Sequence, residues 1–177
     1  MRLALVPHSD SPSPAGLAVT CEAMRSAGGR LDLDWRLTGP LAAIWLPPPG
    51  PGGREDELWR TSCLEAFVAD GGTAYHEFNF SPSTAWAAYA FDDWRSGRRD
   101  ATEIAAPRIT AAPGPDSWAM RVELDLAPLA APVWHVGLSA VIEDMEGRLS
   151  YWALAHAVGR PDFHARAGFT LELTEAA

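Results

Sequence analysis

The sequence has few cysteines, no dense run of basic residues and no long apolar segment. Its two cysteines, Cys21 and Cys63, lie far apart without metal-ligand spacing, which predicts buried thiols rather than a disulfide framework. A net charge of −9 would repel the phosphates of nucleic acids and the headgroups of anionic membranes. We therefore expect neither a nucleic-acid partner nor a membrane partner.

Signals for export and for common catalytic folds are also lacking. No apolar stretch is long enough to span a bilayer, and the N-terminal apolar run stops at Pro7, too early for the core of a secretory signal. The chain as given therefore predicts a cytoplasmic protein, although a chain trimmed of its signal would look the same. Glycine-rich phosphate loops, a G-x-S-x-G elbow and an H-E-x-x-H motif are all missing.

The composition fits one globular domain over residues 1–177, with 47% hydrophobic and 21% charged residues. Alternation of apolar and polar residues is the main pattern, and it is clearest in 30–38, where Leu31, Leu33, Trp35 and Leu37 share one face. Further strands are predicted at 2–6, 17–24, 41–46, 62–69, 73–81, 103–111, 116–126, 133–143, 149–155 and 168–174. The segment 84–97 fits helix and strand spacing, and we favour strand. Short strands at such spacing predict an all-β sandwich or barrel of about ten strands.

One predicted strand carries a charge on an apolar face. In 57-ELWRTSCLEAFV-68, Cys63, Glu65 and Phe67 point one way, so the carboxylate must find a partner, change its protonation or belong to a site. After a hairpin turn at 70–72, the next strand places Glu77 and Asn79 together on one face. Two adjacent strands therefore each present a carboxylate among aromatic residues.

Several chemistries fit these residues. Aromatic planes can stack on a sugar while carboxylates and amides bind its hydroxyls. A purely structural alternative is that Arg60 or another arginine pairs with Glu65. A further alternative is glycoside hydrolysis by Glu65 and Glu77, which would need a deep cleft. The spacing of His156, Asp162 and His164 matches no compact zinc pattern, so no metal site is expected.

The blocks LWRTSCLEAFV, YHEFNFSPSTAWAAYAFDDWR, YWALAH and PDFH resemble DOMON-like domains, close to family-nine carbohydrate-binding modules, over about residues 17–173. The resemblance implies an antiparallel immunoglobulin-like or jelly-roll-type β-sandwich. In the sugar binders an aromatic pair clamps the sugar, and a carboxylate six residues beyond the first aromatic binds its hydroxyls. These positions correspond to Trp59 and Glu65, with the second aromatic near Phe163, where those modules have Trp. Asn79 stands where they carry a longer basic side chain.

Other DOMON branches bind b-type haem through a Met and a His, and such binding would make this an electron-transfer or sensor protein. The candidates for these ligands are Met120 or Met145 with His156 or His76, although core packing is the default for Met120. A structural or protein-interaction role is the third alternative.

We therefore expect a non-catalytic module that binds a small ligand, with a saccharide ahead of haem. Its ligand-binding residues are predicted to be Trp59, Glu65, Glu77, Asn79, Trp152, Phe163 and His164. No cofactor is expected apart from haem b in the alternative reading, and the sequence does not fix the oligomeric state.

Overall fold

The structure is a computed structural model that describes residues 2–175, built from β-strands, single turns of 3-10 helix and loops. The strands are β1 (Arg2–Pro7), β2 (Ala18–Ser26), β3 (Arg30–Thr38), β4 (Ile44–Trp45), β5 (Gly53–Arg54), β6 (Cys63–Ala69), β7 (Tyr75–Phe80), β8 (Ala85–Phe91), β9 (Arg99–Asp100), β10 (Arg108–Pro113), β11 (Ser117–Asp125), β12 (Val133–Asp144), β13 (Leu149–Ala153) and β14 (Leu171–Thr174). The 3-10 turns are η1 (Leu41–Ala43), η2 (Leu58–Arg60) and η3 (Arg166–Gly168). Within the described part of the chain, no helix is long and apolar enough to cross a membrane.

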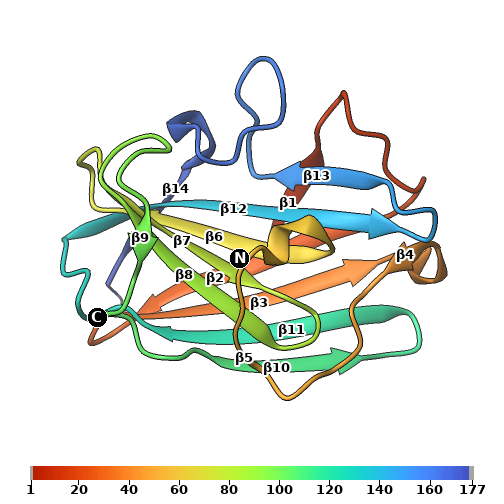
Figure 1. Cartoon of the computed structure of the whole chain (residues 1–177), viewed down its shortest axis with the longest axis horizontal. Helices are drawn as coiled ribbons and strands as arrows, with labels where there is room; N and C mark the ends of the chain where they lie inside the picture. Colours follow the sequence, from red (N-terminus) through yellow and green to blue (C-terminus); the bar gives the residue numbers. More distant parts are fainter. Residues whose placement is uncertain (1, 176–177) are drawn as a thin grey trace.

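Two sheets pack into a β-sandwich (Figure 1). The first sheet has the antiparallel order β10-β11-β3-β2-β1. The second has the order β13-β12-β6-β7-β8, with β4 and β14 added to β12, and β5 and β9 added to β8. β1 joins the two sheets, because residues 2–5 pair with β2 while Val6 and Pro7 pair with β13. The predicted sandwich is confirmed, and residues 2–175 contain more strands than the expected ten, partly because β4, β5 and β9 are two-residue pieces.

The main core lies between the sheets. The predicted inner face of β3 is confirmed, since Leu31, Leu33, Trp35 and Leu37 are buried while Asp34 and Arg36 are exposed. Large side chains of the second sheet, including Trp134 on β12, belong to the same core cluster. Burial of this apolar area is the main favourable contribution to folding.

The second sheet is also covered on its outer face. Every residue of β6 is buried, and a smaller apolar cluster that includes Phe67, Tyr75, Tyr89 and Phe169 lies on this face. In Figure 1 the green loop after β8 and the blue loops after β13 project on the same side of the molecule. A buried outer face explains how Glu65 can be buried although its neighbours Leu64 and Ala66 fill the main core.

Three expected segments differ in detail. The strand predicted at 103–111 begins at Arg108, directly after Pro107, which lacks the N–H that a ladder needs. The segment 41–46 is mostly the turn η1, followed by the two residues of β4. The segment 84–97 is a strand as favoured, but only over β8, because a tight turn follows in which Asp93 and Ser96 bond to each other.

Candidate binding site

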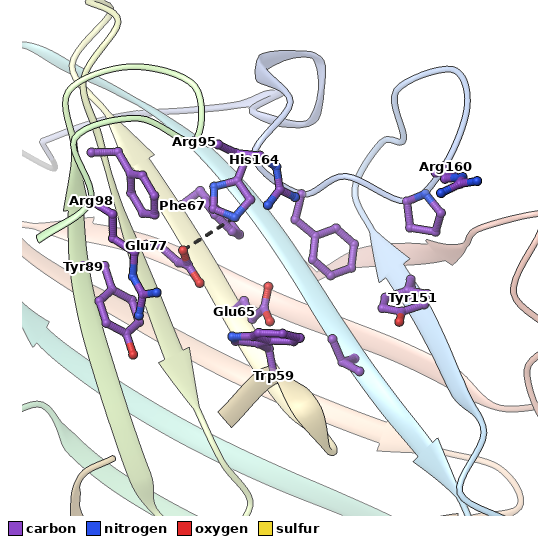
Figure 2. A pocket seen from close by; sticks show the side chains of 14 residues that line it. Trp59, Glu65, Phe67, Glu77, Tyr89, Arg95, Arg98, Tyr151, Arg160 and His164 are labelled. Carbon is purple, nitrogen blue, oxygen red and sulfur yellow. Dashed lines mark ion pairs between the residues drawn. The ribbon is translucent and has the colours of Figure 1, made fainter. Parts of the chain in front are cut away.

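A cavity of about 520 Å³ opens on the outer face of the second sheet. Its floor comes from β6, β7, β8 and β12, and its walls come from η2, the loop after β8 and the loop between β13 and η3 (Figure 2). The lining residues are Trp59, Glu65, Phe67, Glu77, Tyr89, Phe91, Arg95, Arg98, Val141, Tyr151, Arg160, Pro161, Phe163 and His164. The site therefore combines two carboxylates, three guanidinium groups and several aromatic rings.

Strand register places the two carboxylates side by side. Glu65 lies opposite Asn79, and Phe67 lies opposite Glu77, so Glu65 and Glu77 are diagonal neighbours on one face. Such neighbours are about 7 Å apart, within reach of each other's fields. Both are buried, with 2% of Glu65 and 7% of Glu77 exposed. The hairpin that joins them runs through the predicted turn at 70–72.

Glu65 is the less compensated of the two carboxylates. The hydroxyl of Ser139 donates to its Oε2 at 3.1 Å, and among residues 2–175 no arginine or histidine nitrogen comes within ion-pair distance. Arg60, the partner considered from the sequence, pairs instead with Glu57 at 2.8 Å. Burial, together with the charge of Glu77, raises the pKa of Glu65 well above its usual range. Glu65 is thus a buried acid that faces the cavity without a cation.

Glu77 has more partners. The amide of Asn79 donates to its Oε1 at 2.7 Å, and Nε2 of His164 lies 3.7 Å from its Oε2 (Figure 2). Burial raises the pKa of Glu77, while the hydrogen bond from Asn79 and the charge of Arg98 oppose that rise. Asn79 is itself fully buried and is not among the lining residues, so it holds Glu77 in place from behind. Its predicted direct contact with a ligand is therefore corrected to a supporting position.

The hydrogen bonds behind His164 favour one of its tautomers. The backbone N–H of Arg95 donates to the hydroxyl oxygen of Tyr75 at 3.1 Å, and the Tyr75 hydroxyl lies 2.8 Å from Nδ1 of His164. When Tyr75 donates to Nδ1, the ring hydrogen of His164 is on Nε2, which faces Glu77. Burial, followed by the charge of Arg95, lowers the pKa of His164 to about 4. The ring of His164 is consequently neutral at neutral pH.

Aromatic side chains surround these polar groups. Trp59 stands on η2, and 45% of it is exposed. Phe163 lines the cavity as well, and its ring centroid lies 6.0 Å from that of Tyr151. The predicted pair Trp59 and Phe163 thus shares one cavity with Glu65.

Asp162 ties two of the cavity walls together. Its Oδ1 accepts a hydrogen bond from Nη2 of Arg95 at 2.8 Å and from the backbone N–H of His164 at 3.1 Å. Its Oδ2 accepts from Nε1 of Trp94 at 3.1 Å. The loop after β8 and the loop after β13 are therefore fixed to each other by one carboxylate, whose pKa these hydrogen bonds lower despite its partial burial.

Trp152, expected in the site, lies elsewhere. It is 3% exposed, packs in the main core and donates from Nε1 to the hydroxyl of Ser150 at 3.0 Å. Because side chains alternate along β13, the preceding residue, Tyr151, faces the cavity instead. The prediction had the right strand and the wrong face.

The residues considered as haem ligands do not line the cavity. Met120 is 1% exposed in the main core, opposite Trp35 on β3. His156 bonds through Nε2 to the carbonyl of Val6 at 2.9 Å. The other candidates are also separate from the cavity, since Met145 is 60% exposed and His76 lies 3.1 Å from a carboxylate oxygen of Glu103.

Sequence reasoning missed the lining residues that carry a hydroxyl or guanidinium group, namely Tyr89, Arg95, Arg98, Tyr151 and Arg160. Strand alternation could have assigned Tyr89 to the face of Ala87, next to Glu77. The three arginines lie in loops, where no period predicts the direction of a side chain.

No protein-family model and no curated protein matches this sequence. Solved structures do match in fold. A candidate carbohydrate-binding protein from Bacteroides uniformis superposes with a TM-score of 0.64 at 15% identity, over 99% of this chain and 85% of its own. A family-nine carbohydrate-binding module from Caldicellulosiruptor kristjanssonii, in complex with cellotriose, gives a TM-score of 0.60 at 8% identity, over 98% of this chain and 82% of its own.

The same organism's family-nine module in complex with glucose gives a TM-score of 0.55 at 9% identity, over 97% of this chain and 84% of its own. The fold is that of a family-nine carbohydrate-binding module. At such low identity the likeness covers the family-nine fold alone, so a function for the cavity must be argued from its own residues.

Proposed function

We propose that this protein is a non-catalytic module that binds a saccharide in the cavity over β6 and β7. The observation that carries the proposal is Glu65, a buried carboxyl that has no cationic partner within residues 2–175 and faces a cavity rimmed by aromatic residues. A buried carboxyl of this kind costs stability unless hydrogen-bond donors satisfy it. Sugar hydroxyls are such donors, and the solved family-nine neighbours were obtained with cellotriose and with glucose.

The proposed recognition divides the ligand between two kinds of surface. The apolar C–H face of a pyranose ring stacks on Trp59 and Phe163, while its hydroxyls donate to Glu65 and Glu77 and accept from Nε2 of His164. A volume of about 520 Å³ suits one or two sugar units. We expect modest affinity, because the rim is open and Trp59 stays partly in water.

The position of the carboxylates favours binding over hydrolysis. Glycosidases place two carboxyl groups on either side of the scissile bond. Glu65 and Glu77 instead lie on adjacent strands of one floor, and Asn79 holds Glu77 from behind. We therefore expect no release of reducing sugar from oligosaccharides by the purified protein.

Tryptophan emission tests the proposal directly. The protein is titrated with a panel of sugars and, in parallel, with haemin, for the wild type, Trp59→Ala and Trp45→Ala. Trp45 is the matched control, because it is 43% exposed but is not among the residues that line the cavity. We expect a saturable response to a sugar that is lost in Trp59→Ala and kept in Trp45→Ala. A stoichiometric response with a Soret band for haemin alone would replace the proposal with the haem alternative.

A further inference from the structure

Cationic side chains line the cavity although the chain as a whole is acidic. The net charge is −9, yet Arg95, Arg98 and Arg160 line the cavity together with Glu65 and Glu77. Arg95 is neutralised by Asp162 at 2.8 Å. Within residues 2–175, no carboxylate oxygen lies within 4.0 Å of the guanidinium nitrogens of Arg98 or Arg160. These two cations are therefore available to a ligand.

Arg98 is held in position by an aromatic ring. Its guanidinium carbon lies 4.1 Å from the centroid of Tyr89, whose hydroxyl donates to Asp56 at 2.6 Å. Stacking on a ring fixes the plane of a guanidinium and leaves its in-plane N–H groups free to donate. Figure 2 shows the Arg98 side chain beside Tyr89, on the wall of the cavity near Glu77.

Two adjacent parts of the site offer opposite chemistry. The floor presents carboxyl oxygens, which suit hydroxyl donors, and the wall at Arg98 presents N–H donors, which suit an anionic acceptor. A neutral sugar would satisfy the floor but could offer the guanidinium of Arg98 only uncharged hydroxyl acceptors, whose hydrogen bonds are weaker than those of a carboxylate. A sugar with a carboxylate would satisfy both parts.

We propose, on the basis of the saccharide-binding function above, that the ligand is an acidic saccharide of the uronic acid class, whose carboxylate pairs with Arg98. Its hydroxyls bind Glu65 and Glu77 as described. Arg160, on the loop after β13, adds positive potential that draws the anion to the cavity against the net charge of the chain. A guanidinium and a carboxylate form two parallel hydrogen bonds, which gives this pairing its geometric selectivity.

Calorimetric titration with glucose, glucuronate and glucose 6-phosphate tests the assignment. These ligands differ at carbon six, where they carry a hydroxymethyl group, a carboxylate or a phosphate ester. The matched variants are Arg98→Gln and Arg99→Gln, which remove the same charge at adjacent positions. Arg99 is the control, because it pairs with Glu103 at 3.1 Å and does not line the cavity.

We expect the wild type to bind glucuronate about tenfold or more tightly than glucose, the factor given by about 1.4 kcal/mol. Arg98→Gln brings that ratio close to one, whereas Arg99→Gln keeps it, and added salt lowers it. Equal affinity for glucose and glucuronate in the wild type would refute the acidic ligand and leave saccharide binding intact. A preference that survives Arg98→Gln would refute the role of Arg98, and a preference for the phosphate ester would refute the carboxylate. Absence of binding by every sugar would refute the proposed function itself.

Discussion

Replacing Glu65 by Gln is expected to stabilise the protein at neutral pH. The pKa of Glu65 is raised well above the ordinary value of 4.5, because the side chain is buried beside Glu77. A carboxyl whose folded pKa is raised contributes stability below its unfolded pKa, and this contribution is lost as the pH rises. Gln keeps an oxygen that can accept the hydrogen bond from Ser139 and does not ionise.

The size of the gain follows from the pH. Glu65 ionises in the unfolded chain above pH 4.5. If it stays protonated in the fold at pH 7, the free energy of unfolding falls by 1.36 kcal/mol for each of the 2.5 pH units above 4.5, or about 3 kcal/mol in total. This value is a ceiling, because a lower folded pKa gives a smaller cost. In a chain of this size, about 3 kcal/mol corresponds to a Tm rise of about 6–12 °C. The difference between variant and wild type should shrink toward zero as the pH approaches 4.5.

Circular dichroism melting curves from pH 5 to pH 8 measure this difference. Glu55→Gln serves as the control, since it removes a carboxylate from an exposed side chain. We expect Glu65→Gln to melt above the wild type at pH 8, with a margin that falls as the pH is lowered, and Glu55→Gln to show no such trend. A Tm for Glu65→Gln that lies below the wild type at every pH would show that the ionised carboxylate is well compensated, and the reasoning above would be wrong.

Three further outcomes follow from the same site. Burial lowers the pKa of His164 from 6.5 to about 4, so the neutral ring contributes up to about 3 kcal/mol to the free energy of unfolding above pH 6.5, and this contribution is lost as the pH falls through 4. Denaturant unfolding at several pH values should show that His164→Gln removes this part of the acid sensitivity. Asp162→Asn should lower the free energy of unfolding by about 1 kcal/mol and speed hydrogen exchange in residues 92–98, since the hydrogen bonds of Asp162 to Arg95 and Trp94 join two loops. Unchanged exchange would show that these hydrogen bonds do not hold the loops together. Glucose affinity should rise from pH 5 to pH 8 in calorimetric titrations, because hydroxyl donors favour the ionised form of Glu65, and a flat profile would argue against that contact.

The sequence was most informative where a strand has one apolar face and one polar face. In β3 and β11 the alternation assigned both the element and its inner side, because only one face of the first sheet is buried deeply. Glu65 could be singled out for a related reason, since a charge among Cys63 and Phe67 breaks an otherwise apolar face. The energetic cost of burying its charge, rather than a sequence motif, identified Glu65 as a candidate site residue.

The same reasoning failed where both faces of a strand are buried. On β13 the neighbours Tyr151 and Trp152 are both aromatic, so composition does not say which of them enters the main core. The loops present a different difficulty. Arg98 reaches the cavity because the chain turns sharply after β8 and its guanidinium stacks on Tyr89, a contact between residues nine positions apart that no local period encodes.

The energetics of Glu65 bear on why a carboxylate occupies this position. Glu65 contributes little to the stability of the fold, because it accepts one hydrogen bond from Ser139, and the oxygen of a Gln could accept the same bond. Its cost has a ceiling of about 3 kcal/mol at pH 7, which is a substantial part of the 5–15 kcal/mol by which domains are stable. A neutral residue would therefore serve the fold better. What Gln cannot provide is a carboxyl group that ionises when hydroxyl donors bind at the floor of the cavity. The measurements that decide the matter are therefore the Tm and the sugar affinity of Glu65→Gln. A variant that is more stable but binds sugar less well would place the role of this carboxylate in the ligand rather than in the fold.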